Sequence, residues 1–205
     1  MALDTYANLK AAIKRHSHRN DIDDVVDDFI DLAEDAMFNN KESVLDSRAL
    51  ETSTTTTTST RTLALPTGFL RFRKLTLTSG GVEYDCIQET PEAMQVTSSG
   101  RPRSFTITDQ IEFDRTPDGT YTVNYIYIAK PTALSSSNAT NAVLTNHPTI
   151  YLYGALWALN LWAHEEEKAA IYWQNFLNAI RGANRASKRQ RHGPAASIRF
   201  EGSTP

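Results

Sequence analysis

The chain has 205 residues, enough for one domain with a substantial core or for two small layers that share one. Its formal net charge of −3, with 22% charged residues, argues against a protein built as a whole to bind polyanions. The lone Cys86 excludes an internal disulfide and, without clustered His or Cys, does not indicate zinc, so a buried, inert thiol is expected. The N-terminal residues lack the apolar run of a signal peptide, and the apolar stretch at 150–163 is too short to span a bilayer. A protein that is cytosolic when made is therefore expected.

Charge is concentrated in two segments of opposite sign. Eight acidic residues and no basic ones lie between Asp21 and Asp35. Five basic residues and no acidic ones lie between Arg181 and His192. The balanced total thus hides an acidic segment and a basic segment, and both fall on predicted helices.

Two helices are predicted before residue 40. Residues 3–18 carry apolar residues at helical spacing, and Asp4 or Thr5 can cap the first turn. The polar sequence HSHRND ends this helix, and Asp21 is expected to cap a second helix that runs to about residue 39. One face of the second helix is an apolar stripe, and the aspartates occupy the other face.

Residues 50–131 are typical of β structure punctuated by turns. The run ETSTTTTTSTRT is interpreted as a strand pair or an edge strand rather than a linker, because Thr favours strands. Gly80 and Gly81 predict a hairpin turn, and PDG at 117–119 predicts a tight turn. The run VNYIYIA at 123–129 is apolar on both sides, which predicts a central strand.

Two more helices are predicted after a connector of small residues at 133–146. The first begins beside Pro148 and is apolar nearly all round, so it is expected to form the buried centre of the helical part. The second runs from about Glu165 to Arg189, with basic residues near its end, where cations suit the helix dipole.

This order of elements predicts an α+β fold. The N- and C-terminal helix pairs are expected to form a four-helix bundle, with an inserted, mainly antiparallel β domain and an extended C-terminal tail. The predicted boundaries are 1–48 and 133–192 for the two parts of the bundle, 49–132 for the β domain and 193–205 for the tail.

The tail begins where HGP ends the last helix, because Gly193 can terminate it and Pro194 cannot continue it. Ile198 and Phe200 alternate with Arg199, as an extended strap that docks on a partner requires. Such a tail is expected to order only on docking.

No pattern in the chain predicts catalysis. HEEEK at 164–168 lacks the second His of a zinc-binding HExxH helix, and an acidic first turn of a helix accounts for it. The acids of the second helix lie on a periodic face without supporting His or Gly-rich sequence, which favours a solvated or partner-facing surface over a carboxylate site. The histidines are scattered near helix ends. We therefore expect no catalytic residue, no metal and no cofactor.

The basic cluster RGANRASKRQRH has three interpretations. It compensates the helix dipole and aids solubility, it binds DNA in an accessory protein, or it meets the acidic helix of a neighbouring subunit. Head-to-tail contacts of the last kind close into rings. The predicted contact residues are Asp23, Asp27 and Asp31 on one side and Arg181, Arg185, Lys188 and Arg189 on the other. The acidic helix is equally suited to line a channel through which DNA slides.

Three stretches resemble the head-to-tail adaptor proteins of short-tailed phages, the tail tubular protein A-like family. YANLKAAIKRHSHRNDI with FIDLAE resembles the family's opening helices, and LPTGFLRFRKL resembles its "L-P-x-x-F-L-x-x-R-x-L" stretch. YGAL followed by WQNFLNAIRGAN resembles its closing helix pair, and AASIRF resembles its terminal tail. The segment NNKESVLDSRAL is less basic than in many members, which leaves any contact expected of it open.

The resemblance implies a structural virion protein at the portal–tail junction, assembled in the host cytoplasm. It implies a dodecameric ring below the portal protein that continues the DNA channel and carries the tail nozzle protein and tail fibres, with no membrane partner. The residues implied for portal binding are Pro194, Ala195, Ser197, Ile198, Arg199 and Phe200. The loops expected to face nozzle or fibres contain Gly80, Gly81, Ser99, Arg101 and Asp118. A DNA-binding accessory protein and a wall-degrading tail enzyme are the alternatives.

Overall fold

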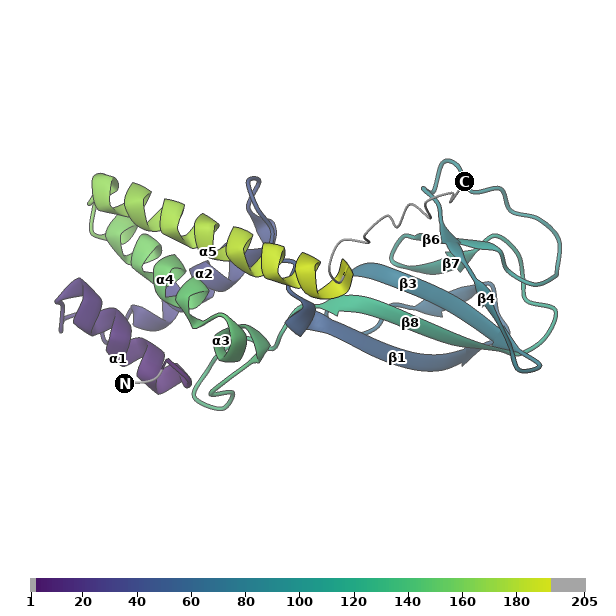
Figure 1. Cartoon of the computed structure of the whole chain (residues 1–205), viewed down its shortest axis with the longest axis horizontal. Coiled ribbons are helices and arrows are strands. Elements are labelled where there is room, and N and C mark those ends of the chain that lie inside the picture. The colour runs from purple at the N-terminus through teal and green to yellow at the C-terminus, as the bar shows by residue number, and fades with distance from the viewer. Residues whose placement is uncertain (1–2, 193–205) are drawn as a thin grey trace, which may run out of the picture. The chain divides into compact units, whose positions relative to one another are not determined.

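A computed structural model describes residues 3–192 and divides the chain into two compact units (Figure 1). The helical unit comprises residues 1–49 and 132–205, and the β unit comprises residues 50–131. Because the β unit lies in sequence between the two parts of the helical unit, the chain has the predicted α+β fold with an inserted β unit.

The helical unit begins close to where the sequence predicts. Thr5 caps the first helix, since its side chain accepts a hydrogen bond from the Asn8 backbone N–H at 3.3 Å. The helices of this unit are α1 (Tyr6–Ser17), α2 (Val26–Asn39), α3 (Ala142–Asn146), α4 (Pro148–Trp162) and α5 (Glu166–His192).

Two predicted helix boundaries are wrong. Asp21 does not cap the second helix, because its carboxylate binds the Arg19 guanidinium at 2.7 and 3.0 Å, and α2 begins only at Val26. The connector expected at 133–146 contains the short helix α3. The Asn141 side chain nucleates it by accepting hydrogen bonds from two backbone N–H groups of its first turn.

Helix α4 is the buried centre of the helical unit, as its all-round apolar sequence predicts. It packs against α1, α2, α3 and α5. Gly154 allows α2 and α5 to approach α4 closely, because a Cβ added there would lie 2.7 Å from the Ala33 Cβ of α2 and 3.0 Å from Cε2 of Phe176 on α5.

The β unit contains two four-stranded sheets. The first has the order β1-β8-β3-β4 and is antiparallel throughout, and the second has the order β2-β7-β6-β5, in which only β5 and β6 are parallel. The Thr-rich run forms the edge strand β1, and VNYIYIA lies in the inner strand β8, both as predicted. The strands are β1 (Glu51–Thr58), β2 (Thr62–Ala64), β3 (Phe69–Ser79), β4 (Val82–Asp85), β5 (Ile87–Gln88), β6 (Ser104–Ile107), β7 (Gln110–Phe113) and β8 (Tyr121–Ala129).

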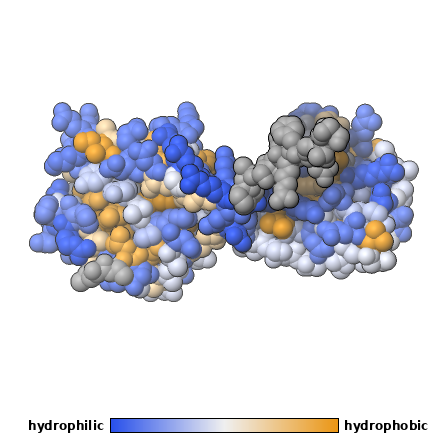
Figure 2. All heavy atoms as spheres, viewed as in Figure 1, coloured by the Kyte–Doolittle hydropathy of each residue, from blue (hydrophilic) through white to orange (hydrophobic). Residues whose placement is uncertain are grey.

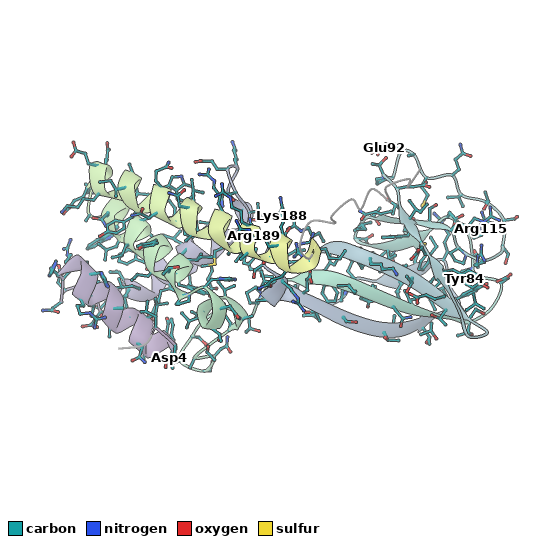
Figure 3. The ribbon with its side chains drawn as sticks, in the orientation of Figure 1. Asp4, Tyr84, Glu92, Arg115, Lys188 and Arg189 are labelled. Atoms are coloured by element: carbon teal, nitrogen blue, oxygen red, sulfur yellow. The ribbon has the colours of Figure 1, made fainter. Side chains whose placement is uncertain are left out.

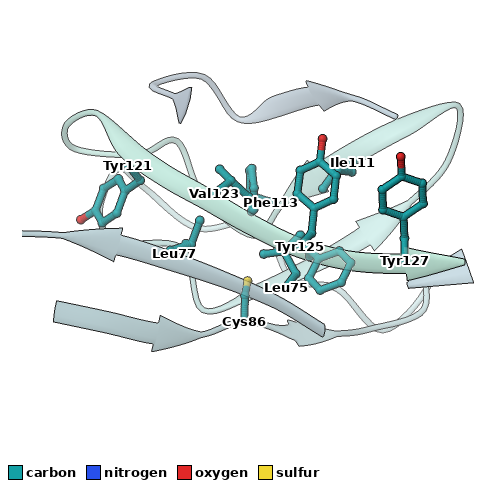
Figure 4. Close-up of a cluster of buried hydrophobic side chains, with 10 residues drawn as sticks. Leu75, Leu77, Cys86, Ile111, Phe113, Tyr121, Val123, Tyr125 and Tyr127 are labelled. Carbon is teal, nitrogen blue, oxygen red and sulfur yellow. The ribbon is translucent and has the colours of Figure 1, made fainter. Parts of the chain in front are cut away.

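Side chains of both sheets form the core of the β unit (Figure 4). Leu77, Val123, Ile111 and Phe113 are fully buried there. Cys86 belongs to the same cluster, and burial raises the pKa of its thiol to about 12. The thiol is therefore protonated at neutral pH, as expected of an inert core cysteine.

Candidate functional site

The acidic surface of α2 is partly neutralised within the chain. Asp27 lies 3.0 Å from Lys10, and Asp23 pairs with Lys14, so two lysines of α1 bind two of the three predicted contact acids. Partial burial raises the pKa of Asp27, but hydrogen bonds from Tyr6 and Lys10 outweigh it and hold that pKa below its ordinary value. Asp27 thus helps to join α1 to α2, and Asp23 helps to join α1 to the turn before α2.

Three of the acids that remain form one stripe, and the exposed Asp35, which accepts a hydrogen bond from the Asn39 amide, follows them. Asp24 lies in the turn before α2, and Asp28 and Asp31 follow it at helical spacing. All three are exposed, and within residues 3–192 none of them forms an ion pair. Partial burial raises the pKa of Asp31, and the charges of Asp28 and Asp27 raise it further. We call these three residues the acidic stripe. Of these three, only Asp31 was predicted from the sequence, because the pairing of Asp23 and Asp27 with lysines depends on how α1 packs.

The end of α5 provides the opposite charge. Arg181 lies 3.6 Å from Glu42. Arg185, Lys188 and Arg189 are exposed and form no ion pair within the described part of the chain. We call these three residues the basic patch. Figure 3 shows Lys188 and Arg189 near the C-terminal end of α5, and Figure 2 shows hydrophilic side chains over this part of the helix. The patch is therefore available to a partner.

A network of polar contacts holds the last turns of α5 to the segment after α2. Arg191 lies 3.3 Å from Asp46, and the buried Ser187 hydroxyl accepts the Arg48 backbone N–H at 2.9 Å. The Asn184 amide contacts both Val44 and Asp46. The sequence analysis missed these contacts, although a polar Ser187 one turn after the buried Ala183 is a signal of them. They fix the direction in which α5 presents the basic patch.

A cavity of about 430 Å³ lies beside this network and is lined by polar groups. His147 lies in its wall, with Nε2 2.8 Å from the hydroxyl oxygen of the buried Ser47. Burial lowers the pKa of His147. Among the residues that the structure describes, no acidic side chain lines the cavity to orient the imidazole as the third group of a catalytic triad does.

The predicted outer loops of the β unit are exposed turns with local supports. Gly80 and Gly81 have φ of 56° and 79°, so glycine is required for this hairpin. The guanidinium of Arg101 lies over the ring of Tyr84 at 4.1 Å, and the carboxylate of Asp118 accepts the Tyr121 hydroxyl at 2.7 Å. Ser99 is also exposed. Tyr84 extends the predicted set, because its ring supports Arg101.

The predicted portal-binding residues 194–200 lie outside the described residues. Within residues 3–192, no group of three or more His, Cys, Asp or Glu side chains is placed to hold a metal ion. Glu166 and Glu167 occupy the first turn of α5, as the dipole interpretation of HEEEK predicts. Among the described helices, none is both long and apolar enough to cross a membrane.

Residues 4–198 match the family model of the SU10 adaptor protein, and the chain therefore belongs to the SU10 adaptor protein family. This is a family of structural phage proteins, so the chain is a phage adaptor of the virion. The comparison with curated proteins returned no match.

Proposed function

We propose that this adaptor is of the tail tubular protein A-like kind and forms a ring, a dodecamer, directly below the portal protein. The ring extends the DNA channel of the portal and carries the tail nozzle and fibres. The observation that carries this proposal is the extent of the family match, which includes both units of the chain and not only one of them. The chain assembles on the portal in the host cytoplasm after DNA packaging.

The ring contact is proposed to join the acidic stripe of one copy to the basic patch of the next. The two surfaces carry opposite charge, are exposed and lie in the same unit, one on α2 and the turn before it and the other on α5. A contact between two different surfaces is heterologous, and such contacts close into a ring where the rotation permits. Asp23 and Asp27 take a smaller part, because α1 already neutralises them.

The remaining contacts are proposed at the two ends of the ring. The tail residues 194–200 are proposed to insert between portal subunits, with Ile198 and Phe200 as the apolar anchors. The loops with Gly80, Gly81, Ser99, Arg101 and Asp118 are proposed to face the nozzle or fibres, and Tyr84 joins them through its contact with Arg101. DNA passes through the lumen without sequence-specific contacts.

Negative-stain images of the purified chain, with and without portal rings, test this proposal. The expected result is a layer of the chain on the portal that is lost with Asp28→Lys/Asp31→Lys and regained when Arg185→Glu/Lys188→Glu is added. Asp109→Lys on the β unit is the matched control, because this acid is exposed and distant in sequence from both surfaces. Wild-type chain that leaves the portal bare contradicts the proposal.

The exposed basic patch also favours a second candidate, an accessory protein that binds DNA. In that case the purified chain binds DNA with an affinity that falls steeply with salt concentration, and Lys188→Ala and Arg189→Ala reduce the salt slope. Binding to portal rings in the absence of any DNA affinity excludes this candidate.

A further inference from the structure

Strand β1 forms one edge of the first sheet of the β unit, and within residues 3–192 it lacks a bulge, a proline and, after Glu51, any charge that would hinder pairing. Strand β1 pairs with β8 over eight consecutive residues without a bulge, and within residues 3–192 no strand lies on its other side. Between Thr52 and Thr58 it carries no charge and no proline. A long, regular, neutral edge is a template for pairing with another strand.

The opposite edge of the same sheet is different. Strand β4 has four residues, and its acids Glu83 and Asp85 lie 3.6 and 3.3 Å from Lys74. Strand β3, which β4 covers only in part, has register shifts between Phe69 and Arg71 and between Phe72 and Lys74. Only β4 itself is therefore regular enough to accept a strand on this edge, and its Val82 is 51% exposed.

The register shows which side chains share a face. Thr57, Thr122, Thr78 and Glu83 lie in one row across the four strands. Because side chains alternate along a strand, Ser53 and Thr55 share the face of Thr57. Thr56 lies in the neighbouring row with Val123, Leu77 and Tyr84, on the face of the core.

Charge and symmetry select one pairing of these two edges. A β4–β4 contact sets Glu83 and Asp85 against the acids of a second copy, which is unfavourable. A β1–β1 contact is isologous and ends at a dimer. A β1–β4 contact that leaves out Glu51, at the start of β1, sets these acids against the neutral Ser53, Thr55 and Thr57. It joins two different edges and repeats from copy to copy.

We propose that β1 of one copy pairs antiparallel with β4 of the next, so that the first sheet continues from subunit to subunit around the ring. Neighbouring strands of this sheet run in opposite directions, so β1 and β4, at its two edges, are antiparallel to each other. When the order β4-β3-β8-β1 repeats in the next copy, β1 of one copy therefore runs antiparallel to β4 of the next. This inference rests on the proposed ring and adds a backbone contact to its charge contact.

Cysteine cross-linking in assembled phage particles tests the pairing. Glu83→Cys is combined in turn with Ser53→Cys, Thr55→Cys and Thr57→Cys, which share its face. Oxidation is expected to give a ladder of dimers, trimers and larger multimers with at least one of these pairs, since disulfides need closely facing Cβ atoms. Glu83→Cys with Thr56→Cys is the matched control, because Thr56 faces the other side of the sheet. The wild-type chain controls for the buried Cys86.

Each outcome decides the proposal. A ladder that needs both cysteines supports it. Dimers from Thr55→Cys alone show β1–β1 pairing and overturn it. Rings that are visible by electron microscopy but give no ladder overturn this inference and leave the proposed adaptor ring standing. Particles that lack a ring of this chain overturn both.

Discussion

Gly154→Ala is expected to destabilise the helical unit, although alanine is the better helix former. The added Cβ would lie 2.7 Å from the Ala33 Cβ and 3.0 Å from Cε2 of Phe176, distances at which neighbouring helices must move. Overpacking of this kind costs about 1–3 kcal/mol, and the gain in helix propensity offsets roughly 1 kcal/mol. We therefore expect a net loss of up to about 2 kcal/mol in the free energy of unfolding.

Gly182→Ala on α5 is the matched control, because an added Cβ there meets no atom within 4 Å. This substitution is expected to stabilise the unit by up to about 1 kcal/mol. All three tryptophans, Trp157, Trp162 and Trp173, lie in the helical unit, so urea unfolding followed by tryptophan fluorescence reports on this unit. Gly154→Ala as stable as Gly182→Ala refutes the close helix approach.

Three further predictions use the same fluorescence assay or simple labelling. Glu34→Ala is expected to lower the free energy of unfolding by about 3 kcal/mol, because the buried Leu134 N–H and Tyr151 hydroxyl both donate to the Glu34 carboxylate, at 2.9 and 2.8 Å. A loss under about 1 kcal/mol contradicts this prediction. Because burial lowers the folded-state pKa of His147, the unfolded chain takes up a proton first as the pH falls through roughly 6.5, so stability is full above that pH and declines below it. His147→Gln is expected to flatten this decline between pH 7 and 5, and an unchanged slope excludes His147 as its source. Cys86, with its raised pKa and buried thiol, is expected to resist a thiol reagent at pH 8 until the β unit unfolds; rapid labelling of the native chain contradicts its burial.

Much of the fold could be predicted because local signals agreed with one another. Thr5 and Asn8 form the first cap where the sequence indicates it, and the run 123–129 becomes an inner strand because it is apolar on both sides. The five-residue α3 was missed because it is too short to show helical periodicity, and its signal is a single capping Asn141. Aspartate is a common N-cap residue, which is why Asp21 was predicted as one, but the Arg19 guanidinium binds its carboxylate instead.

The candidate site was less predictable than the fold, because it depends on pairs that are distant in sequence. Helical spacing identifies all the aspartates of α2 as one polar face, yet only the packing of α1 shows that Asp27 binds Lys10. The Arg191–Asp46 pair joins residues far apart in the chain and has no local signal at all. The acidic stripe and the basic patch could therefore be defined only after these intrachain ion pairs were known.

Cryo-electron microscopy of the portal–tail junction in intact particles tests the central claim most directly. The account predicts a ring of this chain in contact with the portal, with the acidic stripe of each copy facing the basic patch of the next. Density for this chain elsewhere in the particle, or a junction in which these two surfaces face solvent, contradicts it.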